Sequence, residues 1–429
     1  MKLKKISTLA LSIGLIVGSL SAPHAFAQMT SAAAGGRVLS AQGAPVSGAA
    51  VEILHIPTGT VSRLTTDAEG RFSARGLRVG GPYRIVASGN NLEATLDGQY
   101  FELSDTSSLE LVLASGSSVS VEEITVTGSR VGSVFDSSRM GSGSIVGRDQ
   151  IEALPSIGRN IQDYIRTDPR IAQTDKERGE ISAGGQNTRF NNIRIDGVST
   201  NDAFGLESNN LPTVRQPISI DSIESINIAL TNFDVSRSGF TGASVDAVTR
   251  SGTNEITGTV YGVFGDSDWT GKRNGNRFAG FKDESTKGFT IGAPLIKDRL
   301  FIFGSYETFT RSAAAPTFGP TGSNAAQIVR GITTANIQDV QNIAKNVWGF
   351  DAGSFEAPAS LDTDIEDLLV KIDWNINEQH RASFRYNSTE QVEPFLRNID
   401  ARQLSLSSFW HNNNKTFESF LNDFKFSVN

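Results

Sequence analysis

The sequence has 429 residues, a formal net charge of −7, 42 glycines, 25 phenylalanines and no cysteine. The lack of cysteine excludes disulfides and thiolate metal sites, and the acidic balance makes nucleic acid a poor partner. The length predicts about three domains.

The first 27 residues have the pattern of a secretory signal. Three lysines precede an apolar run from Leu9 to Leu20, and an Ala-Phe-Ala sequence ends at Ala27, so we expect cleavage between Ala27 and Gln28. The run of about 12 apolar residues is too short to cross a membrane core that needs roughly 20. Cleavage removes three lysines and no acid, which takes the net charge from −7 to −10.

Residues 28–115 are predicted to form an all-β sandwich, because short β-prone runs recur between turn residues. The expected strands are 36–40, 49–55, 61–65, 71–74, 82–87, 92–96 and 108–113. Asp67 and Glu69 lie in a turn, for which a hairpin role is favoured over a calcium loop. The order Gly36-Arg-Val38, Gly43-Ala-Pro45, Thr66-Asp67 and Gly70-Arg-Phe72 resembles the carboxypeptidase-regulatory-like, transthyretin-type domain.

Residues 116–138 are predicted to be a linker, because Ser, Gly and Val dominate them. In the middle, apolar side chains alternate with threonines. Such a pattern suits an extended segment that adds as an edge strand to another protein's sheet, and a plain β-prone linker is the alternative. The segment consists of Glu122, Glu123, Ile124, Thr125, Val126 and Thr127.

Residues 139–254 are predicted to form a small mixed domain with many loops. Helical turns are expected at 148–154 and from a cap at Asn160 until Asp168-Pro169 stops the second one, and Asp196-Gly197 predicts a tight hairpin turn. Four carboxylates of this domain could include a catalytic pair if the fold placed them close together: Asp196, Asp202, Asp221 and Glu224. Turn and cap roles explain each of them without chemistry. The three histidines outside the signal lie in different segments. We therefore expect no catalytic residues, metal or cofactor, and the protein is not expected to be an enzyme.

Several motifs of this domain resemble the plug of TonB-dependent outer-membrane receptors, most of all their Oar-like branch. They are Gly185-Gln-Asn187 before Arg189-Phe-Asn191, Ile195-Asp-Gly-Val-Ser-Thr-Asn-Asp202, Pro217-Ile-Ser-Ile-Asp-Ser-Ile223, and Gly239-Phe-Thr-Gly-Ala243 leading to Val248-Thr-Arg250. The plug motif residues are Arg189, Asn191, Asp196, Gly197, Asn201, Asp202 and Arg250. The resemblance also implies that residues 122–127 are a TonB box.

Residues 255–429 are predicted to supply the first strands of a transmembrane β-barrel. The expected strands are 256–265, 288–293, 300–311, 367–375, 381–388 and 417–428, with a helix at 334–348. Short turns alternate with longer connections, as in outer-membrane barrels. We expect the chain to be an N-terminal part of such a receptor, because the residues after 255 are too few for a barrel wide enough to hold a plug.

The fold class expected is thus mainly β: a sandwich, a mixed α/β plug and the first strands of an antiparallel barrel. The resemblance implies energy-coupled passage of an unidentified solute, peptide or glycan across the outer membrane, with the N-terminal domain in the periplasm. The implied partners are a TonB-type inner-membrane energy-coupling protein and outer-membrane lipid. The alternative is a surface or periplasmic binding or scaffolding protein without transport activity.

Overall fold

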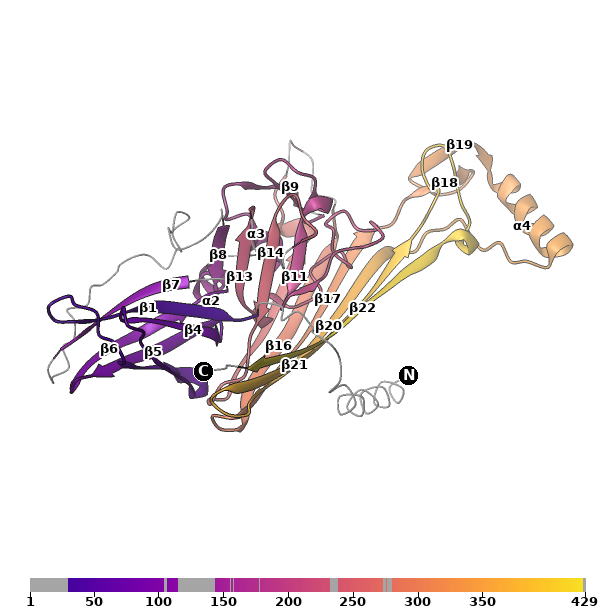
Figure 1. Ribbon diagram of the computed structural model, residues 1–429. Helices are drawn as coiled ribbons and strands as arrows, with labels where there is room; N and C mark the ends of the chain where they lie inside the picture. The colour runs from indigo at the N-terminus through magenta and orange to yellow at the C-terminus, as the bar shows by residue number, and fades with distance from the viewer. Residues whose placement is uncertain are drawn as a thin grey trace.

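The computed structural model describes residues 30–103, 106–114, 143–154, 156, 158–176, 178–231, 238–272, 275 and 280–426. The expected signal cleavage site and the expected TonB box lie outside these residues. The described chain forms an N-terminal β-sandwich, a central domain (143–254) and a sheet of six long strands, which we call the wall sheet (Figure 1).

Two sheets make up the N-terminal β-sandwich, with orders β4-β1-β7 and β3-β2-β5-β6. Their alternating inward residues, such as Val38, Ile53 and Ile85, form one buried core. All seven expected strands are present: β1 (Ala32–Ser40), β2 (Ala50–His55), β3 (Thr60–Thr65), β4 (Arg71–Leu77), β5 (Gly80–Gly89), β6 (Leu92–Phe101) and β7 (Thr106–Leu113), with a 3-10 helix η1 (Ile56–Thr58). The Asp67 carboxylate accepts the N–H groups of Glu69 and Arg71 at 3.0 and 2.7 Å, which confirms its turn role.

The central domain is built on a five-stranded sheet of order β12-β11-β14-β13-β8. Asp196 and Gly197, with φ of 47° and 82°, make the predicted tight turn between β11 and β12. Its elements are β8 (Gly143–Gly147), α2 (Arg148–Ala153), α3 (Ile161–Ile165), β9 (Ile171–Asp175), β10 (Glu180–Ala183), η2 (Thr188–Phe190), β11 (Asn192–Ile195), β12 (Val198–Ser199), η3 (Ile220–Ser222), β13 (Ile223–Ala229) and β14 (Ser244–Thr249).

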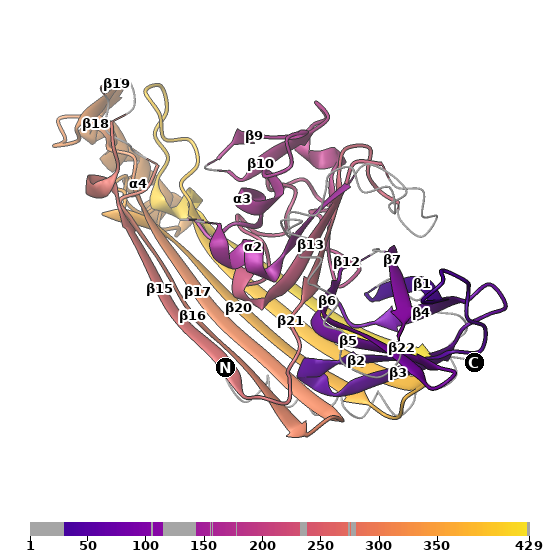
Figure 2. The same cartoon turned by 90° about the vertical axis from the view of Figure 1, so that its left-hand side faces the viewer.

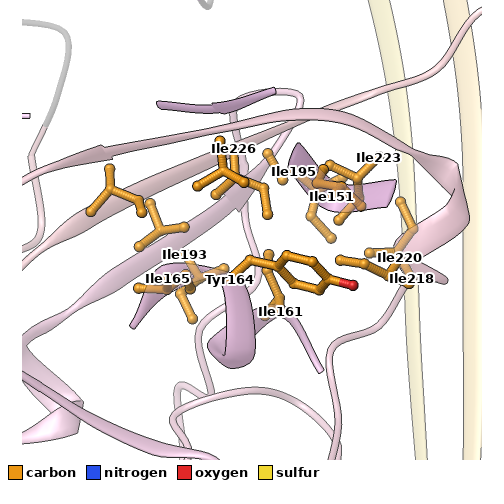
Figure 3. Packing of buried hydrophobic residues seen from close by; sticks show 14 of the residues in the cluster. Ile151, Ile161, Tyr164, Ile165, Ile193, Ile195, Ile218, Ile220, Ile223 and Ile226 are labelled. Atoms are coloured by element: carbon orange, nitrogen blue, oxygen red, sulfur yellow. The ribbon is translucent and has the colours of Figure 1, made fainter. Parts of the chain in front are cut away.

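Isoleucine dominates the core of the central domain, and Tyr164 lies among these side chains (Figure 3). Each buried isoleucine contributes roughly 1.5–3 kcal/mol, so this cluster holds α2 and α3 against the sheet. Phe303 and Leu369 of the wall sheet join the cluster, whereas the core of the N-terminal β-sandwich contains only its own residues.

The wall sheet is antiparallel, and its strands follow chain order: β15 (Thr257–Asp266), β16 (Asp283–Ile296), β17 (Leu300–Ala314), β20 (Ser360–Asn375), β21 (His380–Phe395) and β22 (His411–Phe426). All six expected strands are present, and most are longer than predicted. The connections contain η4 (Ser267–Trp269), β18 (Phe318–Thr321), β19 (Gln327–Thr333), α4 (Thr334–Trp348) and η5 (Ser407–Phe409). The predicted helix at 334–348 is α4, which begins with a capping box of Thr333 and Asn336.

The two faces of the wall sheet differ in polarity: the outer face is apolar, and the buried face combines charged residues with apolar ones such as Phe301, Phe303 and Phe309. On β20, Asp367, Lys371 and Asp373 are buried toward the central domain, while Leu368 and Trp374 on the other face are 39% and 47% exposed. The same exposed face carries Val260, Phe264, Phe289, Ile291, Val392, Phe420 and Phe424. An apolar outer face and a polar inner face are typical of outer-membrane barrel strands. Among the helices of the described residues, none has the length and apolarity that crossing a membrane would require.

Short turns join β16 to β17 and β20 to β21 at one end of the wall sheet, which we call the short-turn end, and longer connections lie at the opposite end. The central domain covers the polar face of the sheet, and the N-terminal β-sandwich lies at the short-turn end (Figure 2). The central domain therefore contacts both other parts.

Candidate functional site

The interface between the central domain and the wall sheet contains two clusters of buried charges. The first, the Asp196 cluster, consists of Asp196, Thr249, Lys371 and Arg385. The second, the Glu307 cluster, consists of Arg159, Arg215, Ser219, Tyr261 and Glu307. Both clusters join residues of the central domain to residues of the wall sheet.

In the Asp196 cluster, a carboxylate from the β11–β12 turn meets a guanidinium from β21. Arg385 Nη1 donates to Asp196 Oδ2 at 3.0 Å, and the side chains are 1% and 3% exposed. Asp196 also accepts the N–H and hydroxyl of Thr249 at 2.8 and 2.6 Å, while Lys371 Nζ donates to the Thr249 carbonyl at 3.1 Å. The hairpin turn is thereby tied to two strands of the wall sheet.

Asp196 is held in its charged form. Burial by itself raises the pKa of the carboxyl group, but Lys371, Arg385 and the bonds from Thr249 outweigh burial and set the pKa below its usual value. Arg385 depends on this carboxylate, because its other contacts are with neutral groups, the Ile195 carbonyl at 3.1 Å and the Ser419 hydroxyl at 3.1 Å. Removing Asp196 would leave a buried cation without its counter-ion.

In the Glu307 cluster, one wall carboxylate receives contacts from both sides of the interface. Tyr261 and Ser219 donate hydroxyl hydrogen bonds to Glu307 Oε2 at 2.6 and 2.9 Å. The guanidinium groups of Arg215 and Arg159 lie 3.8 and 4.0 Å from the same carboxylate. Glu307 is 2% exposed, so its charge is balanced by these arginines rather than by water.

Both arginines of the Glu307 cluster also stack on aromatic side chains of the wall sheet. Arg215 lies 4.3 Å from the ring centre of Phe309, and Arg159 lies 4.1 Å from that of Tyr261. Asn160 was expected to cap the helix that begins at residue 161, but its side chain makes no capping bond. Its Oδ1 instead accepts from Arg215 Nε at 3.2 Å, because the buried guanidinium needs acceptors.

Two of the plug motif residues, Asn191 and Asn201, form a hydrogen-bond scaffold. Asn191 Oδ1 accepts the Ala243 N–H at 2.9 Å, and its Nδ2 donates to the Ile181 carbonyl at 3.1 Å. Asn201 Nδ2 donates to the Asn191 carbonyl at 3.0 Å, and its Oδ1 accepts the Ile193 N–H at 3.0 Å. These amides replace backbone partners in a loop-rich domain.

The other motif residues lie apart from this scaffold. Arg189 is exposed and donates to the Gly205 carbonyl at 2.8 Å. Asp202 accepts the N–H groups of Phe204 and Glu207 at 2.9 and 2.7 Å, which confirms its turn role. Its contacts are therefore local ones within the loop.

Turn and cap roles do not fully describe the remaining carboxylates. Asp196 occupies a turn but pairs with Arg385, Asp221 pairs with Arg148 and Arg159, and Glu224 lies 4.0 Å from Arg250. Burial raises the pKa of Glu224, an effect that Arg250 and Arg148 oppose. These carboxylates neutralise arginines that are held away from water.

A cavity of about 350 Å³ lies where the three parts of the structure meet at the short-turn end. Charged residues line it from the N-terminal β-sandwich (Arg78), the central domain (Arg148, Glu224, Arg250) and the wall sheet (Lys371, Asp373). The structure thus brings the motif residues Asp196 and Arg250 to one cavity, which Asn191, Asn201 and Asp202 do not line.

Sequence reasoning missed the charged residues that join the parts of the structure. They are Arg385 and Lys371 beside Asp196, and also Arg78, Arg159, Arg215 and Glu307. A signal was present in the wall strands, where Arg385 stands between Phe384 and Tyr386 and Lys371 between Val370 and Ile372. A charge at an alternating position in an apolar strand indicates a buried partner across the interface. No group of three or more potential metal ligands occurs among the residues that the structure describes.

Comparisons with known proteins identify relatives of two parts of the chain. A model of the carboxypeptidase regulatory-like domain matches residues 34–114, and a model of the outer membrane beta barrel domain matches residues 248–346. The TonB-dependent transporter Oar of Myxococcus xanthus is 28% identical over 229 residues, which cover 49% of this chain and 19% of that protein. The chain therefore spans about a fifth of the length of this curated relative.

Two solved structures are also similar. The outer membrane transporter YddB from Escherichia coli has 13% identity and a TM-score of 0.47, covering 67% of this chain and 37% of that one. The siderophore receptor PirA from Acinetobacter baumannii has 19% identity and a TM-score of 0.40, covering 59% and 32%.

The predicted resemblance to TonB-dependent receptors, with an N-terminal carboxypeptidase-regulatory-like domain, is confirmed by the family matches and by the Oar relative. The mainly β fold is confirmed as well, and the same matches place the chain in the outer membrane. The curated relative is a transporter and not an enzyme.

Proposed function

We propose that this chain supplies the periplasmic domain, the plug and part of the barrel wall of an outer-membrane transporter that is coupled to a TonB-type protein. The central domain is the plug, and the polar face of the wall sheet lines the passage that it fills. The cargo is an unidentified solute, peptide or glycan. No covalent chemistry is required.

The observation that supports this proposal most directly is the polar character of the plug–wall interface. Besides the apolar contacts of Phe303 and Leu369, the central domain contacts the wall through polar pairs, among them those of the Asp196 and Glu307 clusters and the hydrogen bonds Ser222–Ser305 and Asn387–Pro217. Water can replace such partners when the domain moves, whereas separating two apolar surfaces would expose them. A domain with its own isoleucine core can therefore shift within the wall and remain folded.

The order of segments along the chain supports coupling through the linker. Residues 122–127 are followed by β8, which lies at the edge of the central sheet and pairs with β13. A force applied to the linker would reach β8 before any other strand of this sheet. The alternating apolar residues Ile124 and Val126 suit pairing with a strand of an energy-coupling protein.

Cysteine cross-linking tests the coupling, because the chain has no cysteine of its own. Single variants Ile124→Cys, Thr125→Cys and Val126→Cys are paired with cysteines along the sheet edge of the TonB-type protein in living cells. Strand pairing predicts efficient cross-links that change with position along the box, and Ser118→Cys serves as the control outside it.

Absence of cross-links at all three box positions would contradict the transport proposal. If the protein reaches the outer membrane at normal levels in that case, the alternative of a surface or periplasmic binding and scaffolding protein is favoured. Cross-links that disappear in cells lacking the proton gradient would support energy coupling.

A further inference from the structure

The N-terminal β-sandwich is docked on the short-turn end of the wall sheet by a small set of polar contacts. Arg78 Nη2 donates to Asn375 Oδ1 at 2.9 Å, and Arg78 Nη1 lies 3.5 Å from Asp373 Oδ1. Asn375 Nδ2 in turn donates to Thr60 Oγ1 at 2.9 Å. Arg78 is therefore the centre of the contact between the sandwich and β20.

Further contacts surround Arg78. The Asn254 N–H donates to the Pro57 carbonyl at 2.8 Å, Arg63 pairs with Glu378, and Thr30 donates to Asp423. They extend the contact from the end of the central domain to the turn after β20 and to β22.

Two glycines of the sandwich allow close approach. A Cβ at Gly59 would lie 2.1 Å from Asp298 Oδ1, and a Cβ at Gly80 would lie 2.6 Å from Glu224 Oε1. Both glycines have positive φ, 61° and 97°, which other residues rarely adopt. The sandwich thus fits closely against the short-turn end at Gly59 and against the central domain at Gly80.

Three features make this contact separable. The sandwich and the central domain have separate apolar cores, the contacts are polar, and a cavity of about 350 Å³ remains between the parts. Polar groups released from such a contact can bind water instead, which lowers the free-energy cost of separation.

We propose that the N-terminal β-sandwich is a releasable closure of the periplasmic mouth, which must leave the short-turn end before the central domain can move. This inference rests on the proposed transport function. Short turns face the periplasm in outer-membrane barrels, so the docked sandwich lies below the plug. The linker that carries the TonB box leaves the sandwich after β7 and enters the central domain at β8. A pull on this linker therefore acts between the two docked domains.

An engineered disulfide tests the docking. In a Gly59→Cys/Asp298→Cys variant, the two Cβ atoms would lie 3.3 Å apart, slightly below the usual range of about 3.5–4.5 Å. A second pair, Thr60→Cys/Asn375→Cys, avoids the strain of cysteine at a positive φ. The control pair Thr259→Cys/Thr290→Cys joins β15 to β16 and does not involve the sandwich. The hydroxyl oxygens of Thr259 and Thr290 are 2.7 Å apart.

The three variants are oxidised briefly in cells, with and without a protonophore. We expect both docking pairs to form disulfides efficiently in protonophore-treated cells and several-fold less in energised cells, while the control pair forms equally in both. Docking pairs that stay reduced in de-energised cells, while the control pair forms, would show that the sandwich does not occupy this position. Equal disulfide yields of the docking pairs with and without the proton gradient would show that the sandwich does not leave the short-turn end.

The Val126→Cys cross-link to the TonB-type protein, measured in the same cells, separates this inference from the proposed function. Equal docking yields together with an intact cross-link would overturn the closure and leave the transport proposal standing. Loss of the Val126→Cys cross-link would contradict both the closure by the sandwich and the transport proposal.

Discussion

Replacement of Asp196 by asparagine tests the plug–wall interface most directly. The change keeps the shape of the side chain but leaves Arg385, which is 1% exposed, without its carboxylate, and Lys371 remains nearby. Breaking a buried ion pair from one side costs about 3 kcal/mol or more. An effect of that size raises the population of the released central domain roughly a hundredfold.

Proteolysis in a urea series measures this population in the purified, detergent-solubilised protein. With a urea dependence of about 1.5 kcal/mol per M, the midpoint for cleavage of the central domain should fall by about 2 M. The control is Asp202→Asn, which should cost about 1 kcal/mol: this carboxylate caps a loop of the same domain and forms no ion pair with the wall itself, although Glu207 of that loop pairs with Lys415.

The double variant Asp196→Asn/Arg385→Met provides the second control, because it removes the stranded cation. The urea midpoint of the double variant should recover most of the decrease caused by Asp196→Asn alone. The effects of the two substitutions on stability are then strongly non-additive. Equal midpoints for Asp196→Asn and Asp202→Asn, or additive losses in the double variant, would refute the assignment of Asp196 and Arg385 as a coupled pair.

Three further predictions concern the rest of the chain. Burial lowers the pKa of His55 from 6.5 to about 3, so the unfolded state binds a proton at a higher pH than the folded state does. The sandwich should therefore keep its full stability above pH 6.5 and lose stability as the pH falls toward 3. The loss should reach roughly 3 kcal/mol at about pH 4.5. Limited proteolysis of the sandwich within the intact chain, during heating at several pH values, checks this, and a His55→Gln variant should show a flatter profile. Val126→Pro should leave the outer-membrane level unchanged and abolish cross-linking to the TonB-type protein, because proline removes a backbone donor; normal cross-linking would make residues 122–127 a plain linker. N-terminal sequencing should find Gln28 first, and protein that retains Leu9 to Leu20 would contradict cleavage.

The positions of the strands could be predicted because apolar alternation and turn residues are local signals. Their lengths could not. β20 begins at Ser360, seven residues before the predicted start, and its first residues are rich in acids. These residues are extended because they pair with β17, from Ala314↔Ser360 to Glu307↔Asp367, and not because of their own propensity.

The candidate site could be predicted only on one side. Asp196-Gly197 was recognisable as a turn, but the partner Arg385 lies 189 positions further along the chain. Nothing local connects the two, since the pairing depends on which face of β21 meets the central domain. The same holds for Arg215 and Glu307, which belong to different domains and meet only in the assembled fold.

The isoleucine core of the central domain also determines how its motion can be observed. All four tryptophans, Trp269, Trp348, Trp374 and Trp410, lie after residue 255, so intrinsic fluorescence reports on the wall and its connections and is silent for the plug. Ile151, Ile161 and Ile193, by contrast, carry δ1 methyl groups inside the core. Selective methyl labelling would therefore give nuclear magnetic resonance signals from within the plug, and their exchange broadening would follow the loosening of this domain on the microsecond to millisecond timescale.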